Sequence, residues 1–421
     1  MSRMLNVLLS VYACGNSGSG VEGIIGLNWV RALSRRCRIT VITETGCREQ
    51  IEQEKNRLFA GRIMPEFYYV DIGEHGRRLA KQHGNWWFYW FYRKWQKKVF
   101  LLASQLCRDN SYDIIHNLSL VDYREPGYLC ELKGKHKFIW GPISGFAAFP
   151  EPFFADLGPK AVREYRMKNR INSWQIKHMR RIKRTVANAD RVIAATAEDA
   201  DFIEKHYHKE ACVIPETGAV TGYGGRIHSV DEGILRVAWC GVMDGRKALD
   251  LALKALAEIK KAKRADLIEL HIVGDGEYYR QWMALAESLD VAENCVWYGR
   301  MGHEETLDIM AMCDLFWFTG WREATSTAIV EALAMGLPVL CHDCGGMGEA
   351  VNDSCGIKVR LINPEYSIRN FSRALMTIMD NGDMIEKLSR GALIRANELT
   401  FQAGAERMMT IYNNLCDSEA E

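Results

Sequence analysis

Short apolar runs alternate with longer amphipathic stretches along the whole chain. The runs are rich in Val, Ile, Leu and aromatic residues, as is typical of strands that a parallel sheet buries on both faces. The expected strands are residues 5–12, 38–44, 112–120, 136–145 and 190–196 in the first half, and 211–218, 234–242, 267–276, 294–300, 314–320, 337–343 and 356–359 in the second. The stretches between them, such as 23–36, 248–262 and 278–289, repeat apolar residues at helical spacing. This alternation predicts an α/β fold with two doubly wound parallel sheets.

The two groups of strands predict two domains, because 421 residues exceed the usual size of one. We expect an N-terminal Rossmann-like domain over residues 1–197 and a C-terminal domain over 198–398. The boundary is expected near the helix that begins at Ala197, with the strand at 211–218 opening the second domain. Residues 399–421 form a last segment that is amphipathic when drawn as a helix.

The composition excludes several classes of protein. The 54 Lys and Arg residues balance 53 Asp and Glu residues, so no overall field attracts nucleic acid. Thirteen cysteines, an odd number without framework spacing, predict reduced thiols and a cytoplasmic location. No apolar run reaches the roughly 20 residues that a membrane-spanning helix needs. Residues 4–14 pass directly into a glycine loop and are expected to form a strand, not a signal peptide.

We expect no metal site. Cys341 and Cys344 form a C-x-x-C, but no second pair at zinc spacing accompanies them. Asp199 and Asp201 form a D-x-D, but this pair begins an expected helix, where an acid caps the helix instead of ending a strand.

A glycine motif near the start supports an alternative function. Gly18, Gly20 and Gly23 form a G-x-G-x-x-G, and Glu44 ends the next strand, where a dinucleotide-binding fold places its ribose carboxylate. Alone, this pattern predicts an NAD-dependent oxidoreductase. The first strand ends near Tyr12, however, which leaves a loop longer than the tight turn of such a site.

Residues 314–346 carry the most functional information. They predict a strand, a polar loop and a helix that ends at Gly336. The expected helix start offers three hydroxyls, those of Thr325, Ser326 and Thr327. A helix N-terminus has unpaired N–H groups and a partial positive charge, which suit a phosphate or a sugar hydroxyl. Glu331, about a turn and a half into the helix, is within reach of a ribose bound there.

The same stretch resembles the donor site of a known family. Glu323 and Glu331, with seven residues between them, are followed by a turn that closely resembles the donor-site motif of the retaining family-4 glycosyltransferases, also called glycosyl transferases group 1. The residues of that turn are Ala334, Gly336, Pro338 and Val339. The resemblance implies a GT-B architecture of two facing Rossmann-like domains with a cleft between them, and a final helix that packs back on the N-terminal domain.

The resemblance also implies roles for individual residues. Arg246 and Lys247 are similar to the pair that grips the donor diphosphate, although the arginine that usually follows the glycine is Val242 here. Two cations beside a leaving diphosphate stabilise the negative charge that grows as the glycosidic bond breaks. By the same resemblance, Glu331 binds the ribose, and Glu323 binds the donor sugar together with the amides of 324–327.

Four further positions are similar to family site residues. His116 lies where similar enzymes contact the transferred sugar, and Gly276 lies in a loop near the donor base. Gly18 and Gly20 belong to the glycine loop that lets phosphates approach the backbone. Residues 140–145 resemble a loop of bacterial members that assemble polysaccharides.

Two segments suggest an anionic membrane surface as a partner. Residues 86–98 begin with seven aromatic residues in succession and continue with several Lys and Arg residues. Residues 163–184 contain nine Lys or Arg residues and one acid, Glu164. Indole and phenol rings near cations favour the lipid headgroup zone, which predicts a peripheral position on the inner face of the membrane. The alternative is a buried aromatic cluster beside an ordinary solvated helix.

From these observations we expect a retaining glycosyltransferase. It would move a hexose-type sugar from a nucleoside diphosphate donor to a saccharide or lipid-linked saccharide acceptor, in surface polysaccharide or glycan synthesis. We expect no cofactor beyond the donor substrate. The alternatives are the NAD-dependent oxidoreductase and a non-catalytic, membrane-associated adaptor that keeps only the fold.

Overall fold

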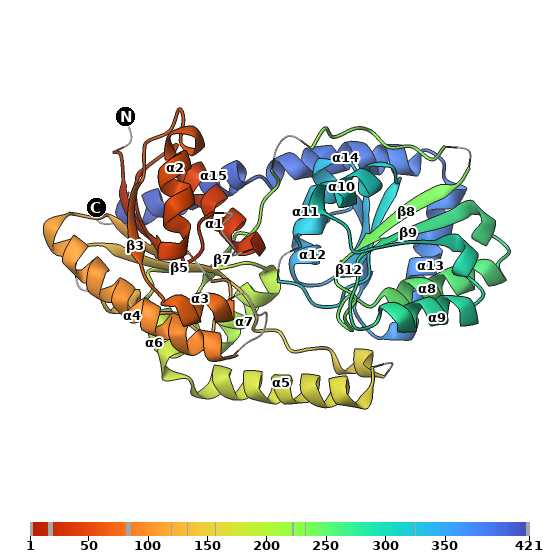
Figure 1. The fold of residues 1–421 in the computed structure, drawn as a ribbon, viewed down its shortest axis with the longest axis horizontal. Coiled ribbons are helices and arrows are strands. Elements are labelled where there is room, and N and C mark those ends of the chain that lie inside the picture. Colours follow the sequence, from red (N-terminus) through yellow and green to blue (C-terminus); the bar gives the residue numbers. More distant parts are fainter. Residues whose placement is uncertain are drawn as a thin grey trace. The chain divides into compact units, whose positions relative to one another are not determined.

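The structure is a computed structural model that describes residues 3–15, 20–80, 86–118, 120–132, 134–155, 157–220, 223–231, 233–324 and 326–417. The chain forms two compact units (Figure 1). Unit 1 comprises Met1–Ala147, Ile171–Glu216 and Phe401–Glu421, and unit 2 comprises Ala148–Arg170 and Thr217–Thr400.

Unit 1 is built on a seven-stranded sheet in which every pair of neighbouring strands is parallel (Figure 1). In spatial order the strands are β3 (Glu66–Val70), β2 (Arg38–Glu44), β1 (Asn6–Ser10), β4 (Ile114–Asn117), β5 (Lys137–Ile143), β6 (Arg191–Ala194) and β7 (Ala211–Val213). Strand β3 was not among the predicted strands, because its apolar run covers only residues 67–70 and so short a run is ambiguous.

The helices of unit 1 cover both faces of this sheet. They are α1 (Gly20–Leu33), α2 (Arg48–Leu58), α3 (Glu74–Ala80), α4 (Trp86–Asp109), the later part of α5 (Pro159–His178), α6 (Arg180–Asn188), α7 (Ala197–Tyr207) and α15 (Phe401–Asp417). Val7 and Leu9 of β1 belong to a core shared with α1 and α15, whereas Leu8 belongs to a core shared with α4 and α6. Alternate residues of one strand therefore serve two cores.

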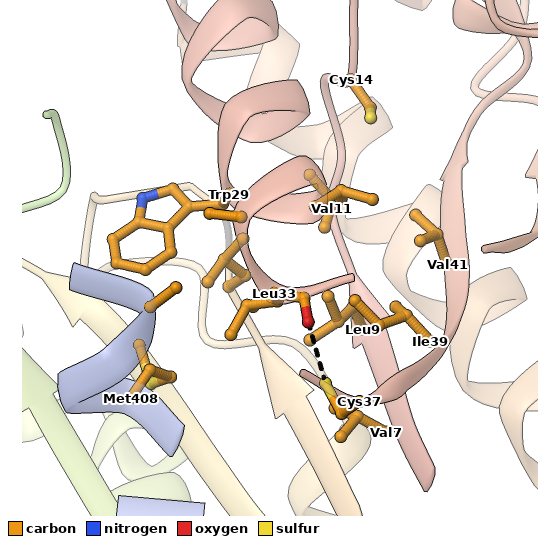
Figure 2. Packing of buried hydrophobic residues seen from close by; sticks show 14 of the residues in the cluster. Val7, Leu9, Val11, Cys14, Trp29, Leu33, Cys37, Ile39, Val41 and Met408 are labelled. Carbon is orange, nitrogen blue, oxygen red and sulfur yellow. Dashed lines mark hydrogen bonds between the residues drawn. The ribbon is translucent and has the colours of Figure 1, made fainter. Parts of the chain in front are cut away.

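The core beneath α1 and α15 is shown in Figure 2. Trp29 and Leu33 of α1 lie near Leu9 of β1, and Met408 of α15 lies on the same side. A Cβ atom added at Gly404 of α15 would lie 2.8 Å from the Trp29 ring, so glycine permits the close approach of the two helices.

Unit 2 is built on a six-stranded parallel sheet, and each of its strands lies where the sequence predicted one. In spatial order the strands are β10 (Cys295–Gly299), β9 (Ile268–Val273), β8 (Leu235–Cys240), β11 (Leu315–Phe318), β12 (Val339–Asp343) and β13 (Gly356–Arg360). The helices are the first part of α5, α8 (Leu249–Lys261), α9 (Tyr279–Ser288), α10 (His303–Ala311), α11 (Thr327–Ala334), α12 (Gly345–Ala350), α13 (Pro364–Asp380) and α14 (Met384–Glu398). Helices α8, α9 and α13 share one core, and α10, α11 and α12 share another.

The division into units differs from the predicted boundary after residue 197. Strand β7 hydrogen-bonds to β6, so residues 198–216 extend the first sheet and do not open the second domain. Residues 148–170, expected in the first domain, pack within unit 2, because Phe153 and Phe154 lie in a core with Trp321. Helix α15 packs against α1 in unit 1.

His116, expected to contact a sugar, lies in the core of unit 1. It is fully buried in β4, and each ring nitrogen has a partner: Nε2 lies 2.6 Å from the carbonyl oxygen of Gly141, and Nδ1 lies 2.6 Å from the hydroxyl of Tyr412. A carbonyl only accepts, so Nε2–H donates to Gly141 and Nδ1 accepts from Tyr412. Burial lowers the pKa of His116 to about 4, which keeps the ring neutral at pH 7. The predicted sugar contact is therefore wrong for this structure, and His116 instead ties α15 to the sheet.

We expect Tyr412→Phe to lower the free energy of unfolding by about 1–3 kcal/mol, because the buried Nδ1 of His116 would lose its donor. The measurement is urea unfolding followed by tryptophan fluorescence. Tyr68→Phe is the control, because the Tyr68 hydroxyl donates to Glu66 at an exposed position, and we expect a change within about 0.5 kcal/mol. Equal effects of the two substitutions would contradict this role for Tyr412.

Candidate functional site

The order of strands in unit 2 marks where a ligand can bind. From β8 the chain adds β9 and β10 on one side, and it then returns to place β11, β12 and β13 on the other. The order therefore reverses between β8 and β11. In open parallel sheets, the loops that follow the strands on either side of such a reversal form the binding crevice. These loops are residues 241–248 after β8 and 319–326 after β11.

The loop after β8, here called the cation loop (residues 241–247), is shaped by its neighbours. The amide of Gly241 donates to the carbonyl of Val273 at 3.1 Å, and the amide of Met243 donates to the carbonyl of Asp275 at 3.0 Å. Gly274 has φ +139°, and a Cβ atom there would lie 2.0 Å from the carbonyl oxygen of Gly241. A Cβ atom at Gly276 would lie 2.6 Å from the carbonyl oxygen of Met243. Both glycines therefore let the β9 loop pack directly under the cation loop.

The cation loop and the loop after β11 meet at Glu323. One carboxylate oxygen of Glu323 lies 2.7 Å from Nζ of Lys247 and 3.0 Å from the guanidinium of Arg246. Arg246 also donates two hydrogen bonds to Asp244, at 3.1 and 2.9 Å. The structure thus brings together three of the four residues predicted to be catalytic, and it adds Asp244, whose role only the folded loop reveals.

The cluster contains two cations, Arg246 and Lys247, and two carboxylates, Asp244 and Glu323, and much of it is shielded from water. The side chains of Lys247 and Glu323 are only 15% and 14% exposed. Burial acts to lower the pKa of Arg246, but the charges of Glu323 and Asp244 outweigh it and raise that pKa. Nζ of Lys247 also lies 4.5 Å from the centre of the Phe318 ring. An ammonium group has three donors, so Lys247 can bind a further anion besides Glu323.

The start of α11 follows Glu323 directly. Ser326 is the N-cap residue, and Thr327 begins the helix. Within the described part of the chain, the Ser326 side chain makes no capping hydrogen bond to the first turn. Thr325 lies outside the described residues. The backbone of Glu323 is held by α12, because the amide of Gly346 donates to its carbonyl oxygen at 3.0 Å.

Glu331 borders the same site from α11. Burial raises the pKa of Glu331, and nearby His303 opposes that rise. Its carboxylate lies 3.4 Å from Nε2 of His303 and 3.5 Å from the hydroxyl of Tyr223. Burial is the main cause that raises the pKa of Cys240, at the end of β8, to about 12. The charge of Lys247 acts to lower this pKa, and the charge of Glu331 acts to raise it. Tyr223 and His303 were not among the predicted site residues, because neither belongs to a motif with fixed spacing.

Glu44, the ribose carboxylate expected for a dinucleotide-binding site, is engaged in other contacts. Glu44 is buried, forms a 3.0 Å ion pair with Arg77, and accepts a hydrogen bond from the amide of Gly46. Its carboxylate is thus committed to local structure and does not present itself to a ribose. Gly18 lies outside the described residues, and Gly20 is the first residue of α1.

The described ranges contain neither a metal-binding cluster nor a membrane-spanning helix. No group of three His, Cys, Asp or Glu side chains within them is arranged to hold a metal ion. Among the helices in those ranges, none combines the length and the apolar character that a bilayer crossing requires.

Comparisons with known proteins agree with this geometry. Residues 228–394 match the family described as glycosyl transferases group 1. The chain is 26% identical over 247 residues to a D-inositol 3-phosphate glycosyltransferase of Nocardia farcinica, a match that covers 55% of this chain and 54% of the relative. It is 33% identical over 113 residues to the lipopolysaccharide glucosyltransferase WaaG of Escherichia coli, covering 27% of this chain and 29% of the relative. The chain spans about half the length of the curated relatives that it matches first.

Solved structures extend the likeness to nearly the whole chain. A glycosyltransferase of Rickettsia africae has a TM-score of 0.61 at 14% identity and covers 98% of this chain and 99% of its own. Alr3699/HepE of Anabaena, solved in complex with UDP, has a TM-score of 0.60 at 12% identity and covers 98% of this chain and 100% of its own. Together with the two parallel sheets, these likenesses confirm the predicted α/β fold of GT-B type.

We expect Gly274→Ala to lower the free energy of unfolding by roughly 2–4 kcal/mol, because the new methyl group would collide with the carbonyl of Gly241 at a backbone angle that L residues rarely adopt. Gly382→Ala is the control, because a Cβ atom there meets nothing within 4 Å. Urea unfolding of both variants tests the difference. A Gly274→Ala protein as stable as the control would show that the β9 loop does not support the cation loop.

Proposed function

Because residues 228–394 belong to the glycosyl transferases group 1 family, we propose that the chain is a retaining glycosyltransferase. It transfers a hexose-type sugar from a nucleoside diphosphate to a saccharide acceptor carried on a lipid, in surface polysaccharide or glycan synthesis. The observation that carries the proposal is the convergence of Arg246, Lys247 and Glu323 where the strand order of unit 2 reverses.

Each residue of the cluster has a role in the proposed reaction. Lys247 and Arg246 bind the diphosphate, and the amides at the start of α11 add partial positive charge. Glu331 accepts hydrogen bonds from the ribose. When the cations turn to the diphosphate, Glu323 is released to accept hydrogen bonds from hydroxyls of the donor sugar. His116 has no part in this scheme, because it is buried in unit 1.

The proposed chemistry breaks the bond between the anomeric carbon and the diphosphate oxygen. The bond from the acceptor oxygen forms on the same face of the sugar, and the acceptor's proton passes to a departing phosphate oxygen. Lys247 and Arg246 stabilise the charge that grows on the diphosphate, which is stabilisation specific to the transition state. No metal ion is required in this scheme.

Relatives and structural neighbours support the choice of substrates. The Anabaena protein was solved with UDP, a nucleoside diphosphate of the kind that the cation loop would hold. The Escherichia coli relative is named for glucosyl transfer to lipopolysaccharide, a saccharide carried on lipid.

We further propose that unit 1 rests on an anionic membrane surface. The aromatic run of α4 is divided: Tyr92 is buried, whereas Trp87 and Trp90 are 53% and 47% exposed. Nζ of Lys94 lies 3.4 Å from the centre of the Trp90 ring, and Lys97 and Lys98 continue the exposed side. Tyr92, with the partly buried Phe88 and Phe91 packed against the same core, thus behaves as the alternative interpretation expected. Trp87 and Trp90 combine exposed indoles with cations, as in segments that bind the headgroup zone.

We expect Lys247→Ala to lower turnover at least about 100-fold, because the transition state would lose a buried cation beside the leaving diphosphate. A thermal-shift panel of UDP, GDP and ADP sugars first identifies the donor, and release of the nucleoside diphosphate then measures turnover. Lys254→Ala is the control, because this partly buried lysine pairs with Asp250 on α8.

Three results would contradict the proposed function. Unchanged turnover in Lys247→Ala would remove Lys247 from the reaction. Micromolar binding of NADH without binding of any nucleotide sugar would favour the oxidoreductase. Donor binding without hydrolysis or transfer to any saccharide acceptor would favour the non-catalytic adaptor.

For the membrane surface, we expect the protein to sediment with vesicles of phosphatidylcholine and phosphatidylglycerol, and much less with phosphatidylcholine alone. The double substitution Trp87→Ser and Trp90→Ser should abolish most of this binding, and raised salt should weaken it in the parent protein. Ile394→Ser is the control, because Ile394 is 64% exposed in unit 2. Equal binding of the double variant and the control would contradict the proposed surface.

A further inference from the structure

Trp321 joins the two loops of the site through its backbone and its side chain. It follows β11 and is only 2% exposed. Its indole N–H donates to the carbonyl of Gly245 at 3.0 Å, and its backbone N–H donates to the carbonyl of Arg246 at 3.1 Å. A single residue therefore holds two consecutive carbonyls of the cation loop.

A third carbonyl is held from the same side. The hydroxyl of Thr319 donates to the carbonyl of Lys247 at 2.7 Å. The hydroxyl oxygen in turn accepts a hydrogen bond from the indole of Trp239 on β8 at 3.0 Å, which fixes its orientation. The carbonyls of residues 245, 246 and 247 thus all accept hydrogen bonds from the chain that leaves β11. Two of these three residues carry the cations of the site.

The side chain of Trp321 is held by a segment that lies far away in the sequence. Residues 148–170 surround it with aromatic rings, and none of them belongs to the family match at 228–394. The ring-centre distances to Trp321 are 6.0 Å for Phe149, 6.3 Å for Phe153, 6.4 Å for Phe154 and 5.5 Å for Tyr165. Edge-on and tilted contacts of this kind restrict the rotation of the central ring.

The same segment also limits the cation loop directly. A Cβ atom at Gly245 would lie 2.7 Å from Cδ2 of Leu157 and 3.8 Å from the hydroxyl oxygen of Tyr165. Because these atoms lie so close to Gly245, the loop has little room to move toward residues 148–170. Tyr165 is itself removed from water, and burial, with the nearby charge of Asp244, raises its pKa to about 12.

We propose that Trp321, supported by the aromatic residues of 148–170, is a positioning residue for Arg246 and Lys247. It fixes the loop backbone that carries both cations, so that their side chains need only turn from Glu323 and Asp244 to reach the donor diphosphate. This inference rests on the proposed glycosyl transfer. Displacements near 1 Å at a reacting centre cost up to about 100-fold in rate, so a clamp on the backbone of two such residues has a large effect on turnover.

The test is Trp321→Phe, which keeps a buried aromatic ring and removes the indole N–H. We expect kcat to fall by roughly 10- to 100-fold per folded molecule, with faster amide hydrogen exchange over residues 241–247. Trp317→Phe is the matched control: Trp317 is a buried residue of β11 whose indole N–H has no hydrogen-bond partner in the described part of the chain. It should change neither readout.

A double-mutant cycle with Lys247→Ala separates positioning from simple packing. If Trp321 acts through the cations, its substitution should cost much less in the Lys247→Ala background than in the parent protein. Fully additive losses, or slow exchange of residues 241–247 in Trp321→Phe, would overturn the inference. If Trp321→Phe does not fold, Thr319→Val replaces it in the same cycle and removes the hydrogen bond to the carbonyl of Lys247 together with the one that the Trp239 indole donates to the hydroxyl.

Failure of the proposed function is distinguishable from failure of this inference. A parent protein that binds none of UDP, GDP or ADP and hydrolyses none of their sugars would refute both. A parent protein that transfers sugar, with a Trp321→Phe variant that behaves like Trp317→Phe, would refute the positioning role alone.

Discussion

The site in unit 2 depends on one ionic contact, in which a single oxygen of Glu323 meets both Lys247 and Arg246. Buried charges are costly unless they are paired, and each of these side chains is mostly removed from water. Glu323 and Asp244 neutralise the two cations. Under the proposed function, a diphosphate would offer the cations a larger negative charge and release Glu323 toward the sugar.

The sheet places this contact by its connectivity. Strands β8 and β11 are neighbours in space, but β9 and β10 separate them in sequence, so the loops after β8 and β11 meet at one sheet edge. Gly274 supports this arrangement from below. A Cβ atom at this position would lie 2.0 Å from the carbonyl oxygen of Gly241, so only a residue without a side chain lets the β9 loop pack against the cation loop. Topology determines where the site forms, and close backbone packing determines its precision.

The sequence predicted features that depend on neighbouring residues, such as strands and motifs, but not contacts between residues that are distant in the chain. The strands of unit 2 were predictable because helices bury both faces of the sheet, which demands continuous apolar runs. Edge strand β3 was not predicted, because its apolar run is only four residues long and periodicity is ambiguous over so short a run. The motifs assigned Glu323 and Lys247 to one site, and the structure places the two side chains 2.7 Å apart, a contact that the sequence did not predict. The place of His116 at a strand end gave no sign that Tyr412, 296 positions later, would cover it. Asp244 and Trp321 likewise gain their roles only from the folded loop.

The replacement of an arginine by Val242 is connected with the contacts that hold the cation loop. Val242, 61% exposed, occupies the position where the resembled family carries an arginine. Under the proposed function, the guanidinium comes instead from Arg246, four residues later in the same loop. A guanidinium carried by a different residue of the loop can reach the diphosphate only if the loop backbone keeps one conformation. The hydrogen bonds from Trp321 and Thr319 hold it at residues 245–247, and rings from 148–170 hold Trp321. Under the proposed positioning role, the geometry of the cation loop would therefore depend on a segment outside the family match.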